Sequence, residues 1–273
     1  VWEIPQYRLS MTTRDATTVL LEALAAIERG AGNLAAAAAA YEAILEMVPE
    51  ELRALERLAE LCVQQGDHEG AIDRYDRARR QRPRDASLVN NLAVSHRAAG
   101  RPDTARTLWR EALSLQDDYA DAHYNLGTAL YLDGEFAPAL PHLRRAVELA
   151  PDSAKYHSNA AVAHRAAGLP LRAVAFWQSA IRVDPSYVDA HFNMAFTFQY
   201  DLGDPESALR HWEMARELTP ADADVIMHGA QALLDLGHMD AAASWLRTFL
   251  DRTPQHLRSS ELEAALEKTR AAP

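Results

Sequence analysis

The sequence predicts an all-α protein, a right-handed α-solenoid of about seven helical hairpins with a C-terminal capping helix. Three observations predict it: a proline recurs about every 34 residues, a glycine stands seventeen residues before each proline slot, and an alanine follows each glycine by five residues. Self-similarity at a fixed period of this length is typical of stacked repeats, each of which buries its apolar face against its neighbours.

The three repeated residue types each have a physical role. Proline ends the second helix of a repeat because it cannot continue one, and Asp117 fills the one vacant slot among Pro49, Pro83, Pro151, Pro185, Pro220 and Pro254. Glycine permits the tight turn after the first helix, at Gly32, Gly66, Gly100, Gly134, Gly168, Gly203 and Gly237. Alanine allows close helix contact, at Ala37, Ala71, Ala105, Ala139, Ala173, Ala208 and Ala242.

A second small residue lies midway along every first helix, where the partner helix is expected to cross. It is Ala25, Ala59, Ala93, Gly127, Ala161, Ala195 or Ala230. Large apolar residues at helical spacing, such as Leu58, Leu92, Leu126 and Met194, are expected to fill the core.

The period divides the chain into an N-terminal arm, seven repeats and a tail. The repeats are 18–51, 52–85, 86–119, 120–153, 154–187, 188–222 and 223–256. Repeat 6 has one extra residue, near Gln199, Tyr200 and Asp201, which predicts a bulge in its first helix or a longer turn. The arm, residues 1–17, begins with an apolar stretch before Met11 that is either a vector remnant or a natural docking segment.

Residues 257–273 are expected to form a capping helix and a tail. Ser260 to Glu263 have the pattern of a capping box, which opens helices. Leu262 and Leu266 would then face inward, while Glu261, Glu263, Glu267 and Lys268 would face water. A polar outer face of this kind is what the end of a solenoid requires.

Composition excludes several classes of protein. A net charge of -11 opposes binding to nucleic acid or to an anionic membrane surface. No apolar run reaches the ~18 residues of a membrane span, and the one cysteine cannot form an intrachain disulfide. The first residues lack a signal-peptide pattern, so we expect a cytoplasmic protein; a periplasmic one fits if a signal peptide has been removed.

The repeats resemble the tetratricopeptide repeat (TPR) family over residues 18 to 256. The segments that carry the resemblance most clearly run from Asn91-Leu92-Ala93 to Asp117 and from Asn125-Leu126-Gly127 to Pro151. The resemblance implies that the first helices line a concave groove and that the second helices form the convex back. It is specific for the fold and says little about function.

One position that the family geometry points into the groove is asparagine in four successive repeats: Asn91, Asn125, Asn159 and Asn193. An asparagine amide can donate to one backbone group and accept from another. Helices ~8–10 Å apart match about three extended residues, so these amides could hold an extended peptide by its backbone. The pattern is similar to the asparagine ladder in the TPR superhelix of O-linked N-acetylglucosamine transferase, without that enzyme's catalytic domain. The alternative is that these asparagines stabilise neighbouring helices.

Further predicted groove residues surround this ladder. They are Asn90, Arg97, Tyr124, Tyr131, Lys155, Arg165, Phe192, Phe196, Gln199 and Tyr200. Such a lining suits a partner segment with apolar anchors and an acidic residue or two, although the aromatic residues could instead fill gaps between repeats. The carboxylate clamp of chaperone-binding TPR domains is not expected, because only Asn125 and Lys155 match it.

No enzyme or metal site is predicted. His123, His157 and His191 occupy equivalent positions, as do His96 and His164. Equivalent positions lie ~8–10 Å apart, too far to share an ion. These histidines are therefore interpreted as half-buried structural residues and Cys62 as a core residue. Phosphate-loop, nucleophile-elbow and zinc-protease motifs are absent from the sequence, so we expect no cofactor.

The favoured hypothesis is a non-enzymatic scaffold or adaptor that binds an extended segment of a partner protein. The second is an assembly component that self-associates or docks a folded partner, as pilus, secretion and envelope-assembly TPR proteins do. The third is the substrate-recruiting region of a larger enzyme.

Overall fold

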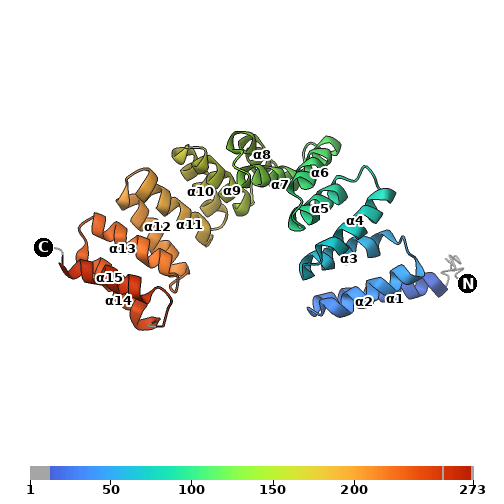
Figure 1. The fold of residues 1–273 in the computed structure, drawn as a ribbon, viewed down its shortest axis with the longest axis horizontal. Coiled ribbons are helices and arrows are strands. Elements are labelled where there is room, and N and C mark those ends of the chain that lie inside the picture. The colour runs from blue at the N-terminus through green and yellow to red at the C-terminus, as the bar shows by residue number, and fades with distance from the viewer. Residues whose placement is uncertain (1–12, 254, 272–273) are drawn as a thin grey trace, which may run out of the picture. The chain divides into compact units, whose positions relative to one another are not determined.

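A computed structural model describes residues 13–253 and 255–271, which form fifteen α-helices and one π-helical segment (Figure 1). In chain order they are α1 Thr13–Gly30, α2 Leu34–Met47, α3 Leu52–Gln65, α4 His68–Gln81, α5 Ala86–Ala98, α6 Pro102–Leu115, α7 Ala120–Leu132, α8 Phe136–Leu149, α9 Ala154–Ala166, α10 Pro170–Val183, α11 Val188–Phe196, η1 Thr197–Asp201, α12 Pro205–Leu218, α13 Ala223–Asp235, α14 Met239–Arg252 and α15 Ser259–Ala271.

The chain divides into two compact units, an N-terminal unit of residues 1–125 and a C-terminal unit of residues 126–273, with the boundary inside α7. In the N-terminal unit the helix pairs α1/α2, α3/α4 and α5/α6 pack as hairpins, and each hairpin contacts the next. In the C-terminal unit the pairs α9/α10, α11/α12 and α13/α14 do the same, and α15 packs on α14. The predicted class, an all-α solenoid of helical hairpins with a capping helix, is confirmed.

The turn after each first helix depends on a left-handed glycine. The seven predicted glycines have φ between 65° and 78°, and they are the only positive-φ positions in the described part of the chain. At Gly66 the amide of the following Asp67 donates to the carbonyl of Cys62 at 2.8 Å, which closes the end of α3. A side chain with a Cβ would strain this backbone conformation.

Small residues set the distance between the two helices of each hairpin. All seven predicted alanines are fully buried, with 0% exposure. The second set, from Ala25 to Ala230, is buried as well. Large side chains fill the spaces between these contacts, and Trp109, Trp177 and Trp212 are fully buried at equivalent positions of the second helices.

The starts of α1 and α15 differ from the predicted repeat and cap boundaries, and the predicted irregularity of repeat 6 is present. α1 begins at Thr13, inside the predicted arm. α15 begins at Ser259 and fully buries Leu262 as expected. The extra residue of repeat 6 forms the π-helix η1. The segment before Met11, interpreted as a vector remnant or a natural docking segment, lies outside the described residues.

We predict that Gly127→Ala destabilises the protein, although the six equivalent residues are alanine. A Cβ at Gly127 would lie 2.7 Å from Cγ of Leu143 and 3.1 Å from its backbone nitrogen. Overpacking of this kind costs about 1–3 kcal/mol, which exceeds the gain of about 1 kcal/mol in helix propensity.

Urea unfolding measures this loss, and Leu143→Ala provides the matched background because it removes the clashing side chain. In that background Gly127→Ala should cost less, because only the 3.1 Å contact with the backbone nitrogen of residue 143 remains. An equal cost in both backgrounds would contradict the steric explanation.

Candidate functional site

The π-helix η1 changes what repeat 6 presents on its two sides. Its widened turn is marked by the amide of Leu202, which donates to the carbonyl of Thr197 at 3.0 Å. On the inner side, Gln199 is buried and accepts a hydrogen bond from the indole nitrogen of Trp212 at 2.8 Å. At the equivalent Trp109 and Trp177, the buried indole nitrogen has no partner among the described residues. The extra residue therefore satisfies a polar group that the other repeats leave unpaired.

On its outer side, η1 presents Tyr200, whose surface is 46% exposed. The Tyr200 hydroxyl lies 2.8 Å from Nδ1 of His228 on α13, and its ring centroid is 4.6 Å from that of Phe196. Phe192 and Trp212 complete the group, because both rings also contact His228. We call Phe192, Phe196, Tyr200, Trp212 and His228 the aromatic cluster.

Arg165 connects this aromatic cluster to α9. Its Nε and one terminal nitrogen donate to the two carboxylate oxygens of Asp201, and its guanidinium lies 4.7 Å from the centroid of Phe196. A bidentate ion pair together with a cation–π contact fixes a side chain far better than a single ion pair does. The face that runs from α9 through α11 and η1 to α13 is therefore preorganised.

A pocket of 480 Å³ opens beside Arg165. Tyr131, Val162 and Asp201 contribute to its walls, and its remaining lining residues are Ala166, Gly168 and Pro170. The pocket is large enough for an apolar or aromatic side chain, and its rim has one guanidinium that already has a carboxylate partner.

The predicted groove asparagines form contacts within the chain. In the N-terminal unit Asn125 donates to Asn90 at 3.0 Å, and Asn90 donates to Asn91 at 3.2 Å. This chain of bonds links two neighbouring helices, which is the alternative stated above. In the C-terminal unit Asn193 donates to the backbone carbonyl of Asp189 at 2.7 Å, and Asn159 also has a contact within the chain. Peptide binding by the four asparagines stays a prediction.

The other predicted groove residues differ in how exposed their side chains are: some are buried, some half-buried and some exposed. Asn90, Tyr124 and Gln199 are buried, so the expectation that they line an open groove is corrected: their side chains pack between helices. Arg97, Tyr131, Arg165, Phe192 and Phe196 are half-buried, and Lys155 and Tyr200 are exposed. Sequence reasoning did not assign Asp201, Trp212 or His228 to this face. The position of Trp212 repeats those of Trp109 and Trp177 and indicates a core residue, and no periodic signal shows which side chains Asp201 and His228 contact.

The equivalent histidines are structural, as predicted. The Nε2 atoms of His123, His157 and His191 lie 3.0, 2.9 and 3.1 Å from backbone carbonyls at the proline slots, Asp117, Pro151 and Pro185. Each ring thereby ties a first helix to the turn before it. Among the residues that the structure describes, no three His, Cys, Asp or Glu side chains come together as metal ligands, and no helix is long and apolar enough to cross a membrane.

His191 also meets His211 from α12, with 3.2 Å between their Nδ1 atoms. Because Nε2 of His191 must donate to the Pro185 carbonyl, its Nδ1 is left to accept a hydrogen bond from Nδ1 of His211. Burial, with smaller contributions from His191 and Arg210, lowers the pKa of His211 to about 4.

The hairpins and their glycine turns define a class, the α-solenoid repeat proteins. The chain belongs to the tetratricopeptide repeat family, because tetratricopeptide repeat models match residues 22–86, 84–152 and 197–256. TPR proteins generally mediate protein–protein interactions.

Known proteins resemble the chain over part of their length. It is 40% identical over 85 residues to the TPR repeat-containing thioredoxin TTL4 of Arabidopsis thaliana, covering 31% of this chain and 12% of TTL4. It is 30% identical over 159 residues to the protein FlbA of Caulobacter vibrioides, covering 58% of this chain and 27% of FlbA. The solved structure of Pseudomonas aeruginosa PilF superimposes with a TM-score of 0.65 at 20% identity, over 78% of this chain and 97% of that chain, which shows a shared fold.

We predict that acid destabilises the C-terminal unit through His211. In the unfolded chain this residue takes up a proton below its ordinary pKa of 6.5, whereas in the folded protein it does so only near 4. The unfolded state therefore binds more protons between these values, and stability falls as pH decreases from 6.5 to 4, by up to about 1.4 kcal/mol per pH unit.

Chemical unfolding at a series of pH values measures this slope. His211→Gln should flatten it, while His238→Gln, a change at an exposed histidine, should leave it unchanged. The explanation is wrong if the His211 variant keeps the wild-type slope.

Proposed function

We propose that this chain is a non-enzymatic protein–protein interaction scaffold, and that the first-helix face of its C-terminal unit binds an extended segment of a partner. The observation that carries the proposal is the contact chain Arg165, Phe196, Tyr200 and His228, which joins first helices of three successive repeats. A surface built across three repeats, with an exposed tyrosine at its centre, suits a linear ligand better than a small molecule.

The chemistry of this face indicates how such a segment would bind. An apolar side chain of the partner would enter the pocket beside Tyr131 and Val162, and a second would pack on Tyr200. Tyrosine and arginine are the residue types that contribute most at such interfaces. Asn159 and Asn193 lie three residues before Val162 and Phe196 on the same helices, so their amides are near enough to contact the ligand backbone.

The non-enzymatic part of the proposal rests on the kinds of residues present. The face holds mainly arginine, asparagine and aromatic side chains. His157 and His191 contact backbone carbonyls, and His228 contacts the Tyr200 hydroxyl. Arginine and aromatic side chains are the residue types that contribute most at protein-binding surfaces.

A peptide selection tests the proposal. Twelve-residue peptides are first selected on the purified wild-type protein from a random display library. They should bind the Tyr200→Ala variant about tenfold more weakly than the wild type, as expected for a hot-spot residue. The double change Asn159→Ala and Asn193→Ala should weaken them further, because it removes contacts to the peptide backbone. Isothermal titration provides the affinities.

Arg182→Ala is the matched control, since this exposed residue lies on the second helix α10. All variants should melt near the wild-type temperature. If the selected peptides bind the tyrosine and asparagine variants as tightly as the wild type, the first-helix face is not the binding site.

A second candidate function, assembly through the N-terminal end, is favoured by the surface of α1. Leu20, Leu24 and Ile27 form a stripe at helical spacing and are 70%, 45% and 67% exposed. One repeat later the same positions are fully buried against the preceding hairpin, at Ala54, Leu58 and Leu61. No described residue covers the stripe, whereas α15 closes the C-terminal end. A second copy of the chain, bringing its own stripe, would cover it symmetrically.

We predict that the double change Leu24→Glu and Ile27→Glu dissociates such a dimer, because it places four carboxylates in the shared contact. Light scattering over a range of concentrations measures the mass, and the matched change Leu169→Glu and Leu171→Glu alters exposed leucines elsewhere. A wild-type protein that is monomeric at all concentrations would exclude this second function.

A further inference from the structure

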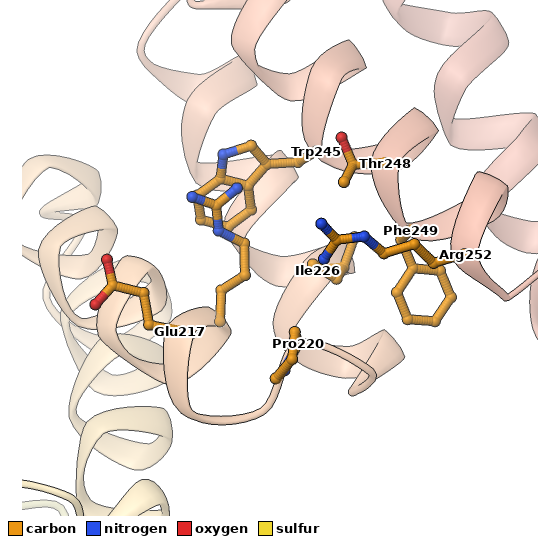
Figure 2. A pocket seen from close by; sticks show the side chains of 8 residues that line it. Glu217, Pro220, Ile226, Trp245, Thr248, Phe249 and Arg252 are labelled. Carbon is orange, nitrogen blue, oxygen red and sulfur yellow. The ribbon is translucent and has the colours of Figure 1, made fainter.

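The second helices of the C-terminal unit form a pocket of 350 Å³ that the first-helix face does not use (Figure 2). Its walls come from the end of α12, the turn that follows, α13 and α14. Ile226, Trp245 and Phe249 provide apolar surface, and Pro220, Glu217 and Thr248 complete the rim with the two arginines Arg216 and Arg252.

The two arginines have no acidic partner. Among the described residues no carboxylate forms an ion pair with Arg216 or Arg252, although more than ten other arginines of the chain are paired. Figure 2 shows Glu217 on the opposite side of the pocket from Arg252. The guanidinium of Arg216 lies 4.0 Å from the centre of the Trp245 ring, which fixes its plane. A stacked arginine keeps its edge N–H groups available for a carboxylate.

The repeat symmetry of the chain shows what is missing from this pocket. Arg216 stands four residues before the slot of Pro220, and Arg79 stands four residues before Pro83. Arg79 forms an ion pair at 2.6 Å with Glu111, which belongs to the next repeat. In the repeat that follows Arg216, the residue equivalent to Glu111 is Thr248. The other repeats have leucine, isoleucine or valine at this arginine position. The same guanidinium site is thus closed by an internal carboxylate in the N-terminal unit and left open in the C-terminal unit.

A second substitution strengthens the contrast. The residue equivalent to Arg252 is Leu115, in the repeat that contributes Glu111. Compared with the site around Arg79 and Glu111, the pocket around Arg216 therefore has one carboxylate fewer and one cation more. The chain as a whole has a charge of -11, which makes two unpaired arginines in one concave site unusual for its surface. They provide a local anion site on an otherwise acidic protein.

From these observations we infer that the pocket between α12 and α14 binds an acidic side chain of a partner protein, whose carboxylate takes the place that Glu111 occupies beside Arg79. The apolar walls select a segment in which this acidic residue is next to a leucine-sized side chain. The pocket's volume holds one or two side chains, so the ligand is a short linear motif. Because the pocket lies on second helices, the inference does not depend on peptide binding by the first-helix face.

The probe for this inference is the peptide acetyl-Leu-Glu-Leu-amide, compared with acetyl-Leu-Gln-Leu-amide. In an NMR titration of the full chain, the glutamate peptide should shift the Trp245 indole and Arg216 Nε signals in a saturable way. The glutamine peptide should bind about tenfold more weakly, because it cannot form the charge-assisted bonds.

Two variants test the site from opposite directions. Thr248→Glu places an internal carboxylate opposite Arg216, as Glu111 stands opposite Arg79, and should weaken glutamate-peptide binding about tenfold while preserving the melting temperature. Arg216→Ile introduces the residue that repeat 5 has at this position and should cause a similar loss. Arg182→Ala, at an exposed site outside the pocket, should bind like the wild type.

Three results would overturn the inference. They are equal binding of the two peptides, wild-type affinity in Thr248→Glu or in Arg216→Ile, and competition by inorganic phosphate as strong as that by the glutamate peptide. The last result would show that the pocket recognises any small anion and takes nothing from the apolar side chains. Peptides selected on the first-helix face should bind Thr248→Glu normally, which separates the two sites.

Discussion

The close approach of the two helices in each hairpin is the contact on which the rest of the structure depends. It requires an alanine where the second helix crosses the first, and an alanine or glycine at the facing position of the first helix. All of these residues are buried. A larger side chain would push the helices apart, because protein interiors tolerate little overpacking. The left-handed glycine directs the chain into this crossing, and the tryptophans of the second helices fill the space beside it.

Because the repeats are so nearly equivalent, their departures from one another carry the information about function. A single extra residue in repeat 6 turns Gln199 inward to satisfy Trp212 and turns Tyr200 outward. A threonine in place of a glutamate leaves Arg216 unpaired. An apolar stripe that is buried in later repeats is exposed on α1. Each departure is local, since a solenoid repeat contacts only its neighbours and can change without disturbing distant repeats.

About half of the ion pairs in the described part of the chain run between successive repeats. Arg79 with Glu111, Arg101 with Glu69 and Arg165 with Asp201 each join groups more than 30 residues apart. Exposed pairs of this kind contribute little to stability individually, typically about 0.2–1 kcal/mol. Their main effect is to neutralise charge along the solenoid. Arg216 differs from these residues, because its guanidinium lies over the Trp245 ring and forms no ion pair with a described carboxylate.

The sequence by itself determined the repeat period, the glycine turns, the alanine contacts, the place of the bulge and the capping role of Leu262, because each depends on residues close together in the chain. It did not determine where the asparagine amides point. Asn125 bonds to Asn90 across 35 positions, so the fate of its amide is decided only when two helices come together. The same holds for Arg165 and Asp201, and for the absence of a partner at Arg216. Local spacing fixes backbone conformation, whereas the pairing of polar side chains depends on which repeats become neighbours, and only the tertiary structure decides that.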